Sequence, residues 1–201
     1  MDNFQLILAS GSPRRIEMMR RSGMEPLIIK PEVDETVSPD MTPEQAVMYL
    51  ALKKALAVEQ QIESGENQWL ISADTVVCHE TIMGKPQNEE EAVAMLSDLR
   101  GREHRVITGV AIVSPGTGKR KVFAETTKVY FKDYDDQVIR DYIASGEVWD
   151  KAGAYAIQGG FGAQVDRIEG DYDNVVGFPW KRFVEELKAL TEGALDFSRS
   201  E

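Results

Sequence analysis

Residues 6–15, LILASGSPRR, join an apolar run to a Ser-Gly-Ser-Pro turn and then to two arginines. The run from Phe4 to Ala9 predicts a buried strand, because nearly all of its side chains are apolar. Ser12 stands where a helix N-cap is expected and Pro13 at the first helical position, so a helix should run to about Ser22. A strand that turns directly into a helix is typical of an α/β fold.

The rest of the chain repeats this alternation, which predicts a layered α/β fold. A capping box of Thr42 and Gln45 opens one helix, and Gly101 and Gly146 end two others. The turn SPGTG predicts a hairpin between two long strands. Predicted strands cover 4–9, 25–30, 68–77, 104–113, 119–131 and part of the glycine-containing stretch 154–168. Predicted helices cover 12–22, 42–62, 88–99, 135–145 and 179–191.

Length and charge narrow the class of protein. The 201 residues suit one large domain or two small lobes around a shared core, and we expect a single domain over 1–192 with a loose tail over 193–201. The formal net charge of −11 argues against broad binding to nucleic acid or to an anionic membrane, so any phosphate site must be local.

Cysteine content and hydropathy predict the compartment. Cys78 is the only cysteine, which excludes an intrachain disulfide, and it is interpreted as a small buried hydrophobe rather than a nucleophile. The start MDNFQLILAS lacks a basic region followed by a long apolar segment, and no run reaches the ~18 apolar residues that cross a bilayer. We therefore expect a cytoplasmic protein with no membrane partner.

The stretch SGSPRR is the first candidate site. A strand-to-helix junction directs unpaired backbone N–H groups and a positive dipole end at one place, which favours an anion. Arg14 and Arg15 add planar donors that suit phosphate oxygens. The alternative is a capped helix with two solvated arginines.

Carboxylates form the second candidate. Asp74 interrupts an apolar strand, so it either ends that strand in a polar turn with Thr75 or meets a cation or metal. The loop PEVDET adds Glu32, Asp34 and Glu35, which taken singly are solvated acids. Near phosphates, such oxygens are the ligands that Mg²⁺ or Mn²⁺ prefers.

The third candidates are Lys54 in ALKKALA, Lys85 in MGKP and Lys151 in WDKAGAY, each of which taken alone is interpreted as a surface lysine. Known nucleotide loops do not explain them: GKP lacks the first glycine of the G-x-x-x-x-G-K-[ST] pattern, and QGGFG lacks the dinucleotide-binding spacing. His79 and His104 show no zinc spacing, which favours structural roles.

Seven segments in order resemble the Maf family of nucleoside triphosphate pyrophosphatases, from Leu6 to about Leu187. The segments are LASGSPRR, VDET, LALKKALA, SADTVV, MGKP, AVAMLSDLRGREHRVITGVA and DKAGAYAIQGGFGAQVDRIEGDYDNVVGFP. The resemblance implies a two-lobed α/β fold, similar to inosine triphosphatase, with a central mixed sheet flanked by helices and an active cleft between the lobes. GFPW departs from the more frequent Gly-Leu-Pro-Leu, which puts local helix geometry in doubt.

The resemblance also implies roles for individual residues. Asp74 matches the family's proton acceptor, and Glu35 matches the acid that helps hold the metal, Mg²⁺ or Mn²⁺. Sequence leaves open whether Asp74 is the base or only a metal ligand. The substrate-binding set implied by the family motifs comprises Ser12, Arg14, Arg15, Lys54, Thr75, Lys85, Lys151 and Gln158, of which Arg14, Thr75 and Gln158 separate the substrate subgroups.

The expected activity is metal-dependent hydrolysis of dTTP and UTP, and of modified pyrimidine nucleotides, to the monophosphate plus pyrophosphate. The resemblance further implies a role in clearing nucleotide pools and in arrest of cell division. Two alternatives stay open: a nucleotide-binding regulator of septum formation with little turnover, and a nucleic-acid-binding module, which the net charge disfavours. A homodimer is an open expectation.

Overall fold

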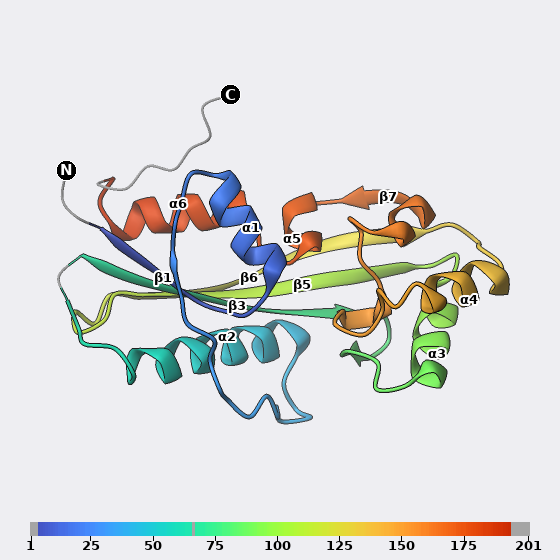
Figure 1. Cartoon of the computed structure of the whole chain (residues 1–201), viewed down its shortest axis with the longest axis horizontal. Helices are drawn as coiled ribbons and strands as arrows, with labels where there is room; N and C mark the ends of the chain where they lie inside the picture. The colour runs from blue at the N-terminus through green and yellow to red at the C-terminus, as the bar shows by residue number, and fades with distance from the viewer. Residues whose placement is uncertain (1–3, 66, 194–201) are drawn as a thin grey trace. The chain divides into compact units, whose positions relative to one another are not determined.

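The structure is a computed structural model, and it describes residues 4–65 and 67–193 (Figure 1). The predicted loose tail lies outside the described residues from position 194 onward. The chain divides into two compact units. Unit 1 contains the chain up to Asp74, Thr108–Glu125 and the chain from Gly177, whereas unit 2 contains Thr75–Ile107 and Thr126–Val176.

The described residues contain a seven-stranded mixed sheet in the order β2-β1-β3-β5-β6-β7, with β4 paired to β3. Strand β1 is parallel to β2 and β3, whereas β4 and β7 run antiparallel to β3 and β6. The predicted α/β class with a mixed sheet is therefore confirmed. The strands are β1 (Gln5–Ala9), β2 (Leu27–Ile28), β3 (Gln68–Cys78), β4 (Ile82–Met83), β5 (Glu103–Val113), β6 (Arg120–Phe131) and β7 (Val165–Glu169).

The α-helices are α1 (Pro13–Arg21), α2 (Pro43–Glu59), α3 (Glu89–Leu99), α4 (Asp136–Ala144), α5 (Tyr172–Val176) and α6 (Trp180–Leu190). Helices α2, α3 and α4 show terminal signals that the sequence carries. The capping box at Thr42 has both of its hydrogen bonds, and Gly101 and Gly146 adopt positive φ after the helices that they end. Two short 3₁₀ helices cover Ala152–Ala154 and Gly160–Gln164.

In unit 1, α2 packs on one face of the sheet, and α1 and α6 lie on the other (Figure 1). Small residues of α2 (Ala51, Ala55) bury against Ile7 and Leu70. Gly109 permits this packing, because a Cβ there would lie 2.4 Å from the backbone of Val47. Helix α2 is thereby fixed against the strands at a backbone distance that any larger residue would prevent.

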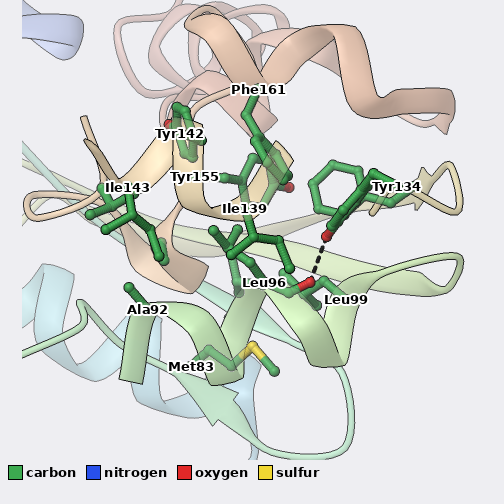
Figure 2. Packing of buried hydrophobic residues seen from close by; sticks show 14 of the residues in the cluster. Met83, Ala92, Leu96, Leu99, Tyr134, Ile139, Tyr142, Ile143, Tyr155 and Phe161 are labelled. Carbon is green, nitrogen blue, oxygen red and sulfur yellow. Dashed lines mark hydrogen bonds between the residues drawn. The ribbon is translucent and has the colours of Figure 1, made fainter. Parts of the chain in front are cut away.

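Unit 2 has an aromatic core. Tyr134, Tyr142, Tyr155 and Phe161 converge with aliphatic residues of α3 and α4 (Figure 2). The Tyr134 hydroxyl donates to the Leu96 carbonyl at 2.6 Å, which joins this core to α3. Edge-on ring contacts, such as Tyr134 with Phe161 at 5.0 Å between centroids, match the geometry that aromatic quadrupoles favour.

Three local predictions need correction, and the short helix α5 was not predicted. Strand β2 has two residues instead of six, and Pro26, which lacks an N–H, precedes them. Helix α2 ends at Glu59 rather than near residue 62, and α5 is too short for a periodic signal to predict. Ser12 occupies the N-cap position, but its side chain makes no capping bond.

Membrane insertion has no helical candidate in the part of the chain that the structure describes. Over residues 4–65 and 67–193, each helix falls short of the length and apolarity that crossing a bilayer requires.

Candidate active site

A buried lysine lies between two carboxylates in unit 1. The Lys54 ammonium contacts Asp74 Oδ1 at 2.6 Å and Glu35 Oε1 at 2.7 Å. The side chains of Lys54 and Asp74 are 11% and 12% exposed, whereas that of Glu35 is 56% exposed. Asp74 thus has the cationic partner that a carboxylate inside an apolar strand requires.

A hydrogen bond between α2 and β3 helps to place Lys54 opposite Asp74. Lys54 is on α2, Asp74 is on β3, and the Ser72 hydroxyl donates to the Ala51 carbonyl at 2.5 Å between the same two elements. Because Ala51 and Lys54 are three residues apart, they lie on one face of α2. The face that buries alanines therefore also directs the lysine at the strand.

The loop that carries Glu35 is fixed by contacts on either side of it. The Lys53 ammonium donates to the Asp34 carbonyl at 2.5 Å. Asp34 Oδ1 in turn accepts from the Thr36 hydroxyl at 2.7 Å and from the Thr36 N–H at 3.0 Å, and these bonds lower the pKa of Asp34. Adjacent lysines of α2 therefore hold this loop in two ways, one through its backbone and one through the Glu35 carboxylate.

Arg15 is a second cation beside this cluster. Its Nε donates to the Gly177 carbonyl at 2.9 Å and its Nη1 to the Ala73 carbonyl at 2.8 Å. Burial lowers the pKa of Arg15 to about 10, and the charge of Asp74 opposes that shift, so Arg15 remains cationic at neutral pH. One of its donors thus fixes the backbone immediately before Asp74, and another fixes the backbone at Gly177.

The other residues of the first motif lie nearby on the same strand-to-helix junction. Arg14 is close enough to Arg15 that its charge contributes to lowering the pKa of Arg15. The Ser12 backbone N–H donates to the buried Ser10 hydroxyl at 3.1 Å. Ser12 therefore contributes to the turn through its backbone.

The four remaining predicted residues belong to unit 2. Thr75 follows Asp74 directly on β3, and Lys85 and Gln158 are exposed. Lys151 is largely buried, and its ammonium donates to the Glu147 carbonyl at 2.6 Å and to Asp150 Oδ1 at 2.5 Å.

Two of the unit 2 motifs meet through their backbones. The Gly153 N–H donates to the Gly84 carbonyl at 3.0 Å, which brings the segment of Lys151 next to that of Lys85. Gly153 has φ of 66°, and a Cβ there would lie 2.9 Å from Val77. The sequence motifs MGKP and DKAGAY therefore form one local structure.

Sequence reasoning missed three residues that hold these groups. Lys53 fixes the Asp34 carbonyl, and Glu147 and Tyr142 contact the segment around Gln158. The tandem Lys-Lys in α2 was the available signal for Lys53. Nothing in the local sequence of Glu147 or Tyr142 indicates their contacts, because the partner groups are backbone atoms 13 and 14 residues away.

A divalent cation fits part of this arrangement. In residues 4–65 and 67–193 no three His, Cys, Asp or Glu side chains form a group that could hold a metal ion. The oxygens of Glu35 and Asp74 nevertheless converge on one cation, the Lys54 ammonium. Because Mg²⁺ commonly takes one or two protein carboxylates and completes its shell with phosphate oxygens and water, this donor pair suits a metal that arrives with a triphosphate.

Both histidines have local partners in unit 2. His79 Nδ1 lies 3.0 Å from Asp98 Oδ2. His104 is buried, with Nε2 2.7 Å from the Tyr155 hydroxyl, and burial lowers the pKa of His104 to about 3. His104 is therefore a neutral core residue at physiological pH.

Comparison with known proteins gives the family. The family model described as "Maf-like protein" matches residues 5–190. A protein named dTTP/UTP pyrophosphatase from Geobacillus sp. (strain WCH70) is 50% identical over 92% of this chain and 98% of its own. Another protein of that name, from Caldicellulosiruptor saccharolyticus, is 46% identical over 92% of this chain and 94% of its own.

Among solved structures, one described as the Staphylococcus aureus Ham1 protein aligns over 95% of this chain and all of its own, with a TM-score of 0.45 and 15% identity. That level of similarity adds no functional argument. The match to the family model over nearly the whole chain, with relatives at 46–50% identity, confirms the resemblance seen in the sequence motifs. The chain belongs to the Maf family.

Proposed function

We propose that this protein is a metal-dependent nucleoside triphosphate pyrophosphatase that hydrolyses dTTP and UTP to the monophosphate and pyrophosphate. The names of its relatives support the substrate class. The observation that carries the proposal is the buried Lys54–Asp74 pair with Glu35 on the same ammonium. A protein that only binds nucleotide has no use for a carboxylate held at this cost in desolvation.

In the proposed reaction, Asp74 accepts a proton from the attacking water. The new P–O bond forms as the anhydride bond between the α and β phosphates breaks, and pyrophosphate leaves with the bonding electrons. Charge grows on the phosphoryl and departing oxygens in this step. Cations that are already in place stabilise that charge without reorganisation, which is the role proposed for Arg14, Arg15 and Lys54.

Glu35 and Asp74 would hold the divalent cation, Mg²⁺ or Mn²⁺. When bound, it would offset the negative charge of the triphosphate oxygens. The Lys54 ammonium keeps these two carboxylates together in the structure, and Arg15 fixes the backbone beside Asp74. Lys85 and Lys151 of unit 2 are proposed to bind phosphate oxygens of the same substrate.

Recognition of the base is assigned to Gln158, with Thr75 and Arg14. A uracil or thymine edge offers a carbonyl acceptor beside an N3–H donor, and the Gln158 carboxamide supplies the matching donor and acceptor. Cytosine would require the amide to flip, so selectivity depends on how firmly the amide is held.

The discriminating experiment is a panel of nucleoside triphosphates assayed with Mg²⁺ and with Mn²⁺ for pyrophosphate and for orthophosphate. We expect pyrophosphate as the first product, with dTTP and UTP turned over fastest. Orthophosphate as the first product would move the cut to the terminal bond and reject the proposal. Binding without turnover of any of these nucleotides would favour the regulatory alternative.

The proposal places the protein in the cytoplasm, where nucleoside triphosphates are made and used. Its single cysteine is consistent with a compartment that keeps thiols reduced. Clearing of pyrimidine nucleotides before polymerases use them is the physiological role that this activity would serve.

A further inference from the structure

The segment 155–161 of unit 2 is anchored at both ends in the aromatic core, and Gln158 and Gly160 are exposed between these ends. Tyr155 and Phe161 are 6% and 1% exposed, and Phe161 packs 4.7 Å from the Tyr142 ring (Figure 2). Gln158 lies midway between these anchors and is exposed. The segment therefore presents one amide to solvent from a firmly packed base.

Backbone turns shorten the segment around Gln158. The Gly159 N–H donates to the Ala156 carbonyl at 3.2 Å, and the Gly162 N–H donates to the Gly159 carbonyl at 3.0 Å. Gly162 approaches the chain so closely that a Cβ would lie 2.3 Å from the Ile157 carbonyl oxygen. The first of these two consecutive turns thus contains the residue that carries the amide, and the second follows it directly.

Groups at the end of α4 complete the anchoring. The Tyr142 hydroxyl accepts from the Ala156 N–H at 3.1 Å. The Glu147 carboxylate accepts from the Gly160 N–H at 3.2 Å, and its Oε2 lies 2.3 Å from where a Cβ on Gly159 would be. The carboxylate therefore lies directly against the two residues that follow Gln158.

A different group of the same residue holds Lys151. The Glu147 backbone carbonyl accepts from the Lys151 ammonium at 2.6 Å. A side-chain substitution at Glu147 leaves that carbonyl in place. Effects of such a substitution on Gln158 can therefore be separated from effects on the lysine.

We propose that Glu147 is a positioning residue whose carboxylate holds the backbone turn that carries Gln158, and so fixes the position from which the Gln158 amide selects uracil and thymine over cytosine. This inference rests on the proposed function, and specifically on base recognition by Gln158. The carboxylate has no part in the proton transfer, so its loss should change the choice between nucleotides more than the rate of the chemical step.

Four variants test this: Glu147→Ala, the conservative Glu147→Gln, Gln158→Ala, and Asp141→Ala as a matched control. Asp141 is an exposed carboxylate of α4 that accepts from Gln137, within the same helix. The first measurement is amide hydrogen exchange over 156–162, which needs no substrate. Loss of one hydrogen bond predicts exchange at Gly160 that is roughly two- to tenfold faster in Glu147→Ala. Glu147→Gln, whose amide oxygen can still accept, and the control should match the wild type.

The second measurement is the ratio of kcat/KM for UTP to that for CTP. We expect this ratio to fall by roughly two- to tenfold in Glu147→Ala, mainly because KM for UTP rises. In Glu147→Gln the ratio should return to the wild-type value. In the Gln158→Ala background, Glu147→Ala should have no further effect, because residues that act through one another are not additive.

An unchanged exchange rate at Gly160 in Glu147→Ala would overturn the proposal. Equal losses of kcat/KM on UTP and on CTP would also overturn it, as would a loss in the double variant that is the sum of the losses in Glu147→Ala and Gln158→Ala. If the wild type releases no pyrophosphate from any pyrimidine triphosphate, the proposed function fails instead. The ratio is then measured as Kd values for UTP and CTP, and a ratio that Glu147→Ala leaves intact still rejects the positioning role.

Discussion

The Lys54–Asp74 pair of unit 1 and Gln158 of unit 2 are held by opposite means. In unit 1, Lys54 and Asp74 are buried and fixed by each other's charge. In unit 2, Gln158 is exposed and is fixed through the backbone of a segment anchored by aromatic rings. A group that carries charge for chemistry gains from a desolvated partner, because the interaction strengthens as water is excluded. A group that reads a base must face solvent until the base arrives, so neighbouring groups must supply its rigidity.

The most severe way to break the unit 1 arrangement is Asp74→Asn. Removal of a general base predicts that kcat falls by about 10²–10⁴-fold, since the amide cannot accept the proton. Binding of dTTP should stay within about tenfold, or ~1.4 kcal/mol, because the phosphate-binding cations remain. Pyrophosphate release and equilibrium binding measure the two effects. Intact turnover would show that Asp74 is not the base.

Charge pairing in unit 1 is tested by Lys54→Met, which leaves Asp74 buried without its closest cation. We expect the free energy of unfolding to fall by about 3 kcal/mol, the lower end for a broken buried pair, because the charge of Arg15 remains nearby. Urea denaturation measures this change. The control is Lys181→Met at an exposed position of α6, for which about 0.5 kcal/mol or less is expected. Equal losses in the two variants would disprove the importance of the buried pair.

Backbone anchoring in unit 2 is tested by Gly153→Ala. The substitution places a Cβ 2.9 Å from Val77 on a residue with positive φ. We therefore expect the free energy of unfolding to fall by about 2–3 kcal/mol. Gly146→Ala is the control, since it has φ of 78° and nothing within 4 Å of its Cβ, and strain alone predicts about 1 kcal/mol. Thermal unfolding of both variants separates the effect of the close contact with Val77 from the effect of backbone strain. Equal losses of stability in the two variants would show that the close contact does not matter.

The aromatic core of unit 2 should also make stability depend on pH through His104. Its pKa of about 3 in the fold lies below the ordinary 6.5, so the unfolded chain binds a proton first as the pH falls. The contribution of His104 to the free energy of unfolding is therefore complete above pH 6.5 and declines between pH 6.5 and 3. At pH 5.5 the free energy of unfolding should be lower by about 1.4 kcal/mol than at high pH. His104→Gln should flatten this part of the stability profile relative to the wild type. A slope that survives the substitution would have to come from other groups.

Local rules predicted most of the elements of both units. The apolar runs that became β1, β3, β5 and β6 and the capping box of α2 each depend on neighbours in sequence, which is why they could be located without coordinates. Strand β2 was overestimated and α5 was missed, because two- and five-residue elements depend on tertiary pairing rather than on periodicity.

The candidate site divides in the same way. The sequence by itself determined that Asp74, within an apolar strand, needs a polar turn or a cation or metal beside it, since an unpaired buried carboxylate is costly. Only the tertiary structure decided that the partner is Lys54, that Lys53 holds the loop of Glu35, and that Glu147 lies against the turn after Gln158. The physical reason is that the residue type sets the free-energy cost of burying a charge or an N–H group without a partner. Which distant group meets that cost depends on how helices and strands pack.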